Sequence, residues 1–178
     1  MEAYINDVRF VSLPPMLVLD GTAVGSEPEE EIMGRMNRLA ASFDLVVGRR
    51  FGFDSPVTAE QAAAHFRGYT YWLSIGEESL ATLPSPESFE FEGTRVTVRR
   101  IAACRYATLR ITDPFADPFV RIGGGFRYLA DWLQDHETRG TTCAAPECAG
   151  SSSAPCLEEI GTVNGITVMD IYIPVPMA

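Results

Sequence analysis

The feature that most constrains the fold is an order of elements that occurs twice along the chain. Two apolar β-type runs, 8–13 and 16–25, precede a helix-type segment from Pro28 and a further β-type run at 69–76. The order returns about 85 to 90 residues later, with runs in 95–112, a helix-type segment from Pro118, and runs at 156–161 and 166–175. We therefore predict an α+β fold of duplicated β-β-α-β units, which form an antiparallel sheet assembly with two packed helices.

This repeat also predicts the domain organisation. Residues 1–178 should form a single domain with pseudo-repeat halves of about 1–92 and 93–178, because one helix per half covers too little core to stand alone. The acidic, proline-rich segment 77–94 is the predicted connection between the halves. Residues 48–68 are predicted to be a loop, with one or two helical turns at 58–66. A central groove at the seam between the halves is a natural place for a ligand.

Each predicted helix has a start signal. Ser26 and Glu29 have the spacing of a capping box around Pro28, and helical periodicity continues to about residue 47. Asp117 precedes Pro118 in the same way at the second helix. One face of that helix carries apolar residues at spacings of three and four, namely Phe119, Ile122, Phe126, Leu129 and Leu133. The glycines at 123–125 weaken it, so either the helix begins after them or a neighbour packs close to its backbone.

Charge and composition exclude several classes of function. The net charge is -10, and all fourteen basic residues are arginine, so no clustered positive surface for nucleic acid is expected. No apolar run approaches the roughly 20 residues of a membrane span. The N-terminus has no basic region followed by an apolar run. We expect a cytoplasmic protein without direct nucleic-acid or membrane contact, and the oligomeric state stays open.

Metal and nucleophile motifs are weak. The spacings between Cys143, Cys148 and Cys156 are too wide for a typical zinc site, and His65 and His136 are isolated. No GxSxG motif occurs. We predict no metal and no cofactor.

Two adjacent glutamates interrupt the β-type run that begins at Leu157. Neighbouring strand residues point to opposite faces, so Glu158 and Glu159 cannot both face water if one face of the sheet is covered. A buried carboxylate is costly unless it is paired or functional. One of the two is therefore a candidate for a ligand-binding acid, and alternation alone does not choose between them.

The ordered motifs "VRFVSLPPMLVLDGTAVG", "IAACRYATLRI", "FRYLADWLQDH", "LEEI" and "DIYIPV" resemble GyrI-like domains over nearly the whole chain. These are small-molecule effector-binding domains, also found fused to AraC-type and MerR-type transcription regulators. The resemblance implies an aromatic-lined pocket that contains a glutamate. Its apolar-Glu-x-aromatic pattern matches Leu157, Glu158 and Ile160, so it assigns the acid to Glu158, with Ile160 in place of the usual tyrosine.

Five aromatic residues complete the predicted ligand site with Glu158; they are Trp72, Tyr106, Phe126, Trp132 and Tyr172. The alternative for each is core filling, which is the usual role of a large aromatic side chain. Only one of Tyr71 and Trp72 can line a given pocket, because they alternate along one strand. We predict Tyr71 in the core and Trp72 in the groove.

Two functions follow from the resemblance. The first is a stand-alone small-molecule-binding protein that captures amphipathic, aromatic or cationic ligands, such as drugs or toxins. The second is a hydrolase of cyclopropane-bearing, electrophilic DNA-alkylating agents, a detoxifying activity in which Glu158 would be the acid or base and Tyr106 its partner. Inhibition of DNA gyrase by protein contact is suggested by the family name only.

Overall fold

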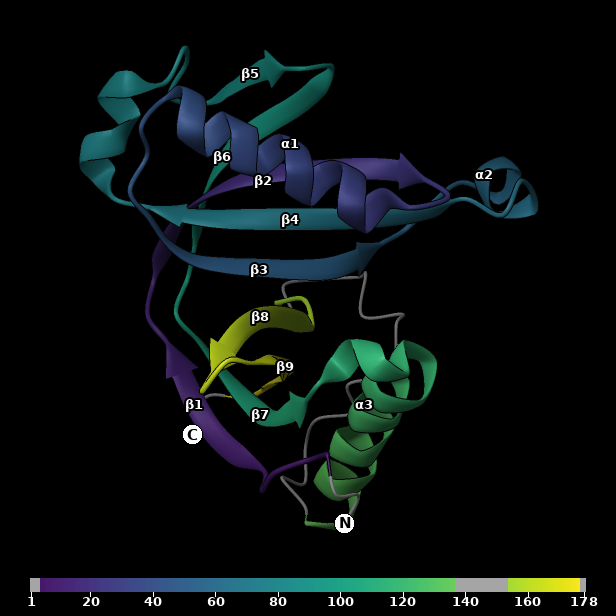
Figure 1. Ribbon diagram of the computed structural model, residues 1–178. Helices are drawn as coiled ribbons and strands as arrows, with labels where there is room; N and C mark the ends of the chain where they lie inside the picture. The colour runs from purple at the N-terminus through teal and green to yellow at the C-terminus, as the bar shows by residue number, and fades with distance from the viewer. Residues whose placement is uncertain (1–3, 137–153, 177–178) are drawn as a thin grey trace. The chain divides into compact units, whose positions relative to one another are not determined.

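The computed structural model describes residues 4–136 and 154–176 (Figure 1). These residues form nine strands, three α-helices and two short 3-10 helices, and the strands pair antiparallel within each of two compact units. Unit 1 comprises 1–14 and 103–178, and unit 2 comprises 15–102. The predicted α+β class with duplicated antiparallel sheets is confirmed.

Unit 2 is a five-stranded sheet covered on one face by a helix. Its elements are β2 (Met16–Gly25), α1 (Pro28–Ser42), β3 (Val47–Ser55), α2 (Ala59–Ala63), β4 (Arg67–Ile75), η1 (Glu77–Thr82), β5 (Ser88–Phe91) and β6 (Thr94–Ile101). The strand order is β3-β4-β2-β6-β5, and α1 lies across β2 and β4 (Figure 1). Apolar side chains of α1, including Ile32 and Leu39, meet Leu19, Leu73 and Val96 of the sheet in a buried core.

Unit 1 is a four-stranded sheet with its own helix. Its elements are β1 (Arg9–Leu13), β7 (Cys104–Thr112), η2 (Pro114–Ala116), α3 (Pro118–Asp135), β8 (Leu157–Val163) and β9 (Ile166–Val175). The strand order is β1-β7-β9-β8. Leu129 of α3 packs against Leu109, Ile111 and Ile171, so one face of this sheet is covered by the helix (Figure 1).

The repeat is completed by an exchange of strands. If α2, β5 and the 3-10 helices are set aside, the order strand, strand, helix, strand, strand occurs twice. The first copy is β1, β2, α1, β3 and β4, and the second copy is β6, β7, α3, β8 and β9. However, β1 pairs with β7, which belongs to the second copy, and β6 pairs with β2, which belongs to the first. The compact units therefore do not coincide with 1–92 and 93–178. The groove predicted at the seam and the predicted single-domain behaviour stay predictions, because the two compact units are described separately.

The predicted loop at 48–68 is wrong over its first part, because β3 occupies Val47–Ser55 and pairs with β4. Two glycines and two arginines hide the strand from a reading of its composition. Their context explains them: Phe51 is fully buried, and a Cβ on Gly52 would collide with the Tyr69 ring. The helical turns expected at 58–66 are present as α2.

The helix boundaries agree only in part with the sequence signals. At α1 the capping residue is Glu27 and no side chain caps the helix, so the predicted Ser26–Glu29 box is wrong, and the helix ends at Ser42 rather than near 47. At α3 the Asp117 carboxylate accepts a hydrogen bond from the Val120 amide, which confirms the predicted start. The α3 helix also includes the three glycines.

The glycines in α3 have a packing reason at one position. A Cβ on Gly125 would lie 2.6 Å from Cδ1 of Ile111 and 3.4 Å from Cδ1 of Ile171. The backbone of α3 thus approaches the sheet of unit 1 closely, which was one of the two alternatives left open by the sequence.

The predicted connection at 77–94 is more ordered than expected, since it contains η1 and β5, and β5 pairs with β6. None of the described helices has the length and apolar character needed to cross a membrane.

Candidate functional site

The two glutamates of β8 lie on opposite faces of the sheet of unit 1, as alternation predicts. Glu158 is paired in register with Ile171, which packs under α3, so Glu158 lies on the helix-covered face. Glu159 is paired with Asp170 and lies on the other face. The faces that alternation left undecided are therefore assigned by strand pairing.

A tyrosine pair accompanies Glu159. The Tyr172 hydroxyl donates a 2.7 Å hydrogen bond to Oε2 of Glu159, and the rings of Tyr172 and Tyr106 meet edge to face with centroids 5.8 Å apart. Both tyrosines are buried, with 4% and 1% of their surface exposed. Burial, assisted by the neighbouring Cys104 thiol, raises the pKa of Tyr106 far above its ordinary value, so this phenol stays neutral.

An arginine–aspartate pair lies beside Glu159 on the same face. Arg110 donates to both carboxylate oxygens of Asp170, at 2.8 Å from Nε and 2.6 Å from the terminal nitrogen. Arg9 of β1 approaches the same carboxylate at 3.8 Å. The pKa of Arg110 is raised mainly by the hydrogen bonds to Asp170. The Arg110–Asp170 pair is a fixed polar part of the pocket lining.

These groups border a pocket of about 210 Å³ in unit 1. It is lined by Arg110, Glu159, Ile160, Gly161, Thr162, Val163, Val168 and Asp170. Two carboxylates and one paired guanidinium leave a site that can receive a positive group, while Ile160, Val163 and Val168 offer apolar surface. The volume is below the range of roughly 300 to 1,000 Å³ for whole drug-sized ligands, so the pocket suits part of a ligand.

Thr108 lies next to this arrangement on β7. It shares a face with Tyr106 and Arg110 and is paired in register with Tyr172. The residue is 2% exposed, and its Oγ1 finds no hydrogen-bond partner in the part of the chain that the structure describes. Buried hydroxyls are normally paired, so this one is an exception within the site.

The structure thus brings together two of the six predicted site residues, Tyr106 and Tyr172, and joins them to Glu159. Glu158, the acid assigned by the family pattern, is on the opposite face. The neighbours Arg110, Asp170 and Thr108 were not among the candidates. A charge within the apolar runs "ATLRIT" and "ITVMDIYIPV" was the signal that could have indicated the first two.

The two predicted residues of α3 lie elsewhere in unit 1. Phe126 packs against the apolar core under the helix. Trp132 is half-buried, stacks on His136 at 4.2 Å, and contacts Phe10 of β1 at 6.0 Å between ring centroids. These contacts place Trp132 at the helix-covered side of β1, apart from the tyrosine pair.

Trp72 belongs to unit 2. Tyr71 packs in the core beneath α1, as predicted, and Trp72 points to the opposite face of β4. Trp72 is 5% exposed, meets Phe53 edge to face at 4.8 Å, and its indole N–H has no acceptor among the described residues. A buried tryptophan usually pairs its N–H, so this side chain also has unmet hydrogen-bonding capacity.

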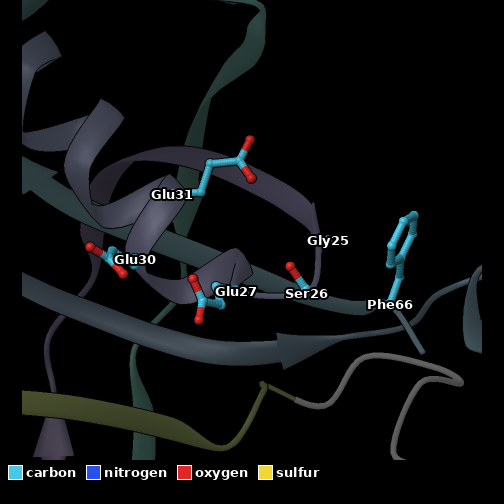
Figure 2. Close-up of a pocket in the computed structure, with 6 residues that line it drawn as sticks. All are labelled: Gly25, Ser26, Glu27, Glu30, Glu31 and Phe66. Carbon is cyan, nitrogen blue, oxygen red and sulfur yellow. The ribbon is translucent and has the colours of Figure 1, made fainter. Parts of the chain in front are cut away.

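Unit 2 has a larger surface hollow of about 490 Å³ at the start of α1, shown in Figure 2. Three glutamates, one aromatic ring and two small neutral residues line it, namely Glu27, Glu30, Glu31, Phe66, Gly25 and Ser26. Glu31 forms an ion pair with Arg35 at 2.6 Å. None of the predicted site residues lies in this hollow. Within the described residues no cluster of three His, Cys, Asp or Glu side chains could hold a metal ion, and Cys143 and Cys148 lie outside them.

Comparison with known proteins identifies the fold. No protein-family model and no curated protein matches the chain. Among solved structures, the C-terminal domain of EcmrR aligns with a TM-score of 0.63 and 10% identity, over 97% of this chain and 98% of that domain. EcmrR in complex with DNA aligns at 0.60 and 9%, over 98% of this chain and 59% of that one.

A hydrolase from Listeria innocua aligns with a TM-score of 0.56 and 12% identity, over 95% of this chain and 91% of the other. Identities this low establish a shared fold and leave the activity open. The architecture is that of GyrI-like domains, in agreement with the resemblance seen in the sequence.

Proposed function

We propose that this chain is a small-molecule-binding protein for amphipathic aromatic cations. The observation that carries the proposal is the Tyr172–Glu159 hydrogen bond beside the buried Tyr106 ring, at the edge of a pocket. It presents a carboxylate at the pocket that is held in position by a buried tyrosine. The GyrI-like fold, which the resemblance associates with effector binding, supports the same function.

The chemistry matches such a ligand. Attraction between a cation and an aromatic ring is worth roughly 0.5 to 2 kcal/mol, and a charge-assisted contact to a carboxylate adds about 1.5 to 3 kcal/mol. Glu159 supplies the charge, and Tyr172 restricts where the carboxylate lies. Asp170 is already paired with Arg110, so it contributes less than Glu159 to the attraction of a positively charged ligand.

A second candidate is hydrolysis of an electrophilic substrate, including the cyclopropane-bearing alkylating agents implied by the resemblance. The same pair favours it, because a carboxylate and a phenol 2.7 Å apart can exchange a proton with a substrate or a water. The name of the Listeria innocua neighbour describes that protein as a hydrolase. Turnover, rather than stoichiometric capture, distinguishes this activity from binding.

The test uses N-methylacridinium, a planar aromatic cation, and acridine, its analogue that is uncharged above neutral pH. Both are titrated by fluorescence against the wild type, Glu159→Gln and Glu158→Gln. We expect Glu159→Gln to weaken N-methylacridinium binding about 10- to 100-fold and to change acridine binding little. Glu158→Gln, on the other face of β8, is the matched control and should have a small effect.

Absence of saturable binding of both compounds to the wild type would overturn the proposal. A larger effect of Glu158→Gln than of Glu159→Gln would return the ligand acid to the residue assigned by the family pattern. Release of a hydrolysed product from an electrophilic cyclopropane substrate at more than one equivalent per protein would favour the enzyme.

A further inference from the structure

Thr108 occupies the centre of the face that carries the proposed site. On β7 it lies between Tyr106 and Arg110, and it is paired in register with Arg9 of β1 on one side and Tyr172 of β9 on the other. Its side chain therefore lies on the same sheet face as Tyr172, the residue that donates a hydrogen bond to Glu159.

The hydroxyl of Thr108 is unusual because it is both buried and unpaired among the described residues. The residue is 2% exposed, and Oγ1 makes no hydrogen bond within the described residues. An unpaired buried hydroxyl destabilises a fold, whereas valine has nearly the same shape and no polar atom. The strand propensity of threonine does not explain why position 108 is threonine rather than valine, because valine has that propensity as well. The hydroxyl therefore has no hydrogen-bond partner among the described residues and can accept a hydrogen bond from a bound molecule or donate one to it.

We propose that Thr108 is a specificity-determining residue, whose hydroxyl forms a hydrogen bond with a polar substituent on the ring system of the bound aromatic cation. This inference rests on the proposed function and adds to it the class of ligand, an aromatic cation that carries an amino or carbonyl group. Glu159 would attract the charge, and Thr108 would distinguish substituted from unsubstituted rings. An ordered water is the other partner that could satisfy the hydroxyl.

The experiment compares two probes that differ only in such substituents, N-methylacridinium and its diamino derivative acriflavine. Each is titrated against the wild type, Thr108→Val and Thr108→Ser, with circular dichroism to verify folding. We expect Thr108→Val to weaken acriflavine binding about tenfold and to change N-methylacridinium binding less than about twofold. Thr108→Ser, which keeps the hydroxyl, should retain the preference for acriflavine.

Three results would overturn the inference. Equal effects of Thr108→Val on the two probes, or no effect on either, would mean that the hydroxyl pairs with water or with nothing, and the proposed function would stand. Loss of the acriflavine preference in Thr108→Ser would assign the effect to side-chain volume. Failure of the wild type to bind either probe would remove both the proposed function and this inference. If Thr108→Val does not fold, the Thr108→Ser titration still decides between hydroxyl and volume.

Discussion

Tyr172 and Glu159 are joined by a 2.7 Å hydrogen bond across β8 and β9, although they are not direct partners in the sheet. Tyr172 is paired with Leu157, and Glu159 with Asp170, so the contact is diagonal. Diagonal neighbours on one face of an antiparallel pair are within reach of a tyrosine side chain. The bond orients the carboxylate toward the pocket lined by Arg110 and Asp170.

Removal of this hydroxyl should loosen the acid while leaving the ring in place. We expect Tyr172→Phe to lower the free energy of unfolding by about 1 kcal/mol, because one part-buried hydrogen bond is lost. Binding of N-methylacridinium should weaken about three- to tenfold, since Glu159 is less restricted. Urea unfolding and fluorescence titration measure the two effects. Tighter binding in Tyr172→Phe would mean that the tyrosine competes with the ligand for the carboxylate.

The Asp170–Arg110 pair should contribute to stability more than an exposed pair of the same geometry. Asp170→Asn should lower the free energy of unfolding by about 2 kcal/mol, because Asp170 is mostly buried and accepts two charge-assisted bonds. Glu92→Gln is the matched control, since Arg38 binds that carboxylate through the same two kinds of nitrogen at an exposed position. Its effect should be smaller. Equal losses in urea unfolding would contradict the role of burial.

Stability at alkaline pH should depend on Tyr106. Its pKa in the folded protein is raised by burial above the value of about 10 for an unfolded chain. The contribution of the neutral phenol is therefore complete below about pH 10 and is lost as the pH rises further, by up to about 1.4 kcal/mol for each pH unit. Urea unfolding between about pH 8 and pH 11 should show a steeper decline for the wild type than for Tyr106→Phe. Parallel declines would show that other groups dominate.

Two glycines of α3 should respond in opposite directions to alanine. At Gly125 a Cβ would lie 2.6 Å from Cδ1 and 3.1 Å from Cγ1 of Ile111, a fully buried side chain. Gly125→Ala should therefore destabilise the protein by about 1 to 2 kcal/mol. At Gly123 the nearest atom is an Arg127 nitrogen at 3.5 Å, an ordinary contact, so Gly123→Ala should stabilise it by about 0.5 to 1 kcal/mol. Thermal unfolding of both variants checks the pair, and a gain at Gly125 would contradict the close approach of helix and sheet.

The sequence by itself determined the local elements with strong periodicity. The bounds predicted for β2 and β9 coincide with the observed Met16–Gly25 and Ile166–Val175, and the Asp117–Pro118 signal located the start of α3. These are effects of neighbours along the chain, such as alternating burial, helix capping and the fixed φ of proline. The doubled order of elements belongs here as well, and the α+β fold class follows from it.

Only the tertiary structure decided which strands pair and which face each side chain occupies. The glycines of β3 hid a strand that exists because Phe51 is buried and the Tyr69 ring lies over Gly52, and the exchange of β1 and β6 joins segments far apart in the sequence. The two glutamates show the reason most directly. Alternation requires that Glu158 and Glu159 face opposite ways, but it does not determine which of them lies on the helix-covered face. The pairing of β8 with β9, and the packing of α3 on one face, put Glu159 beside Tyr172.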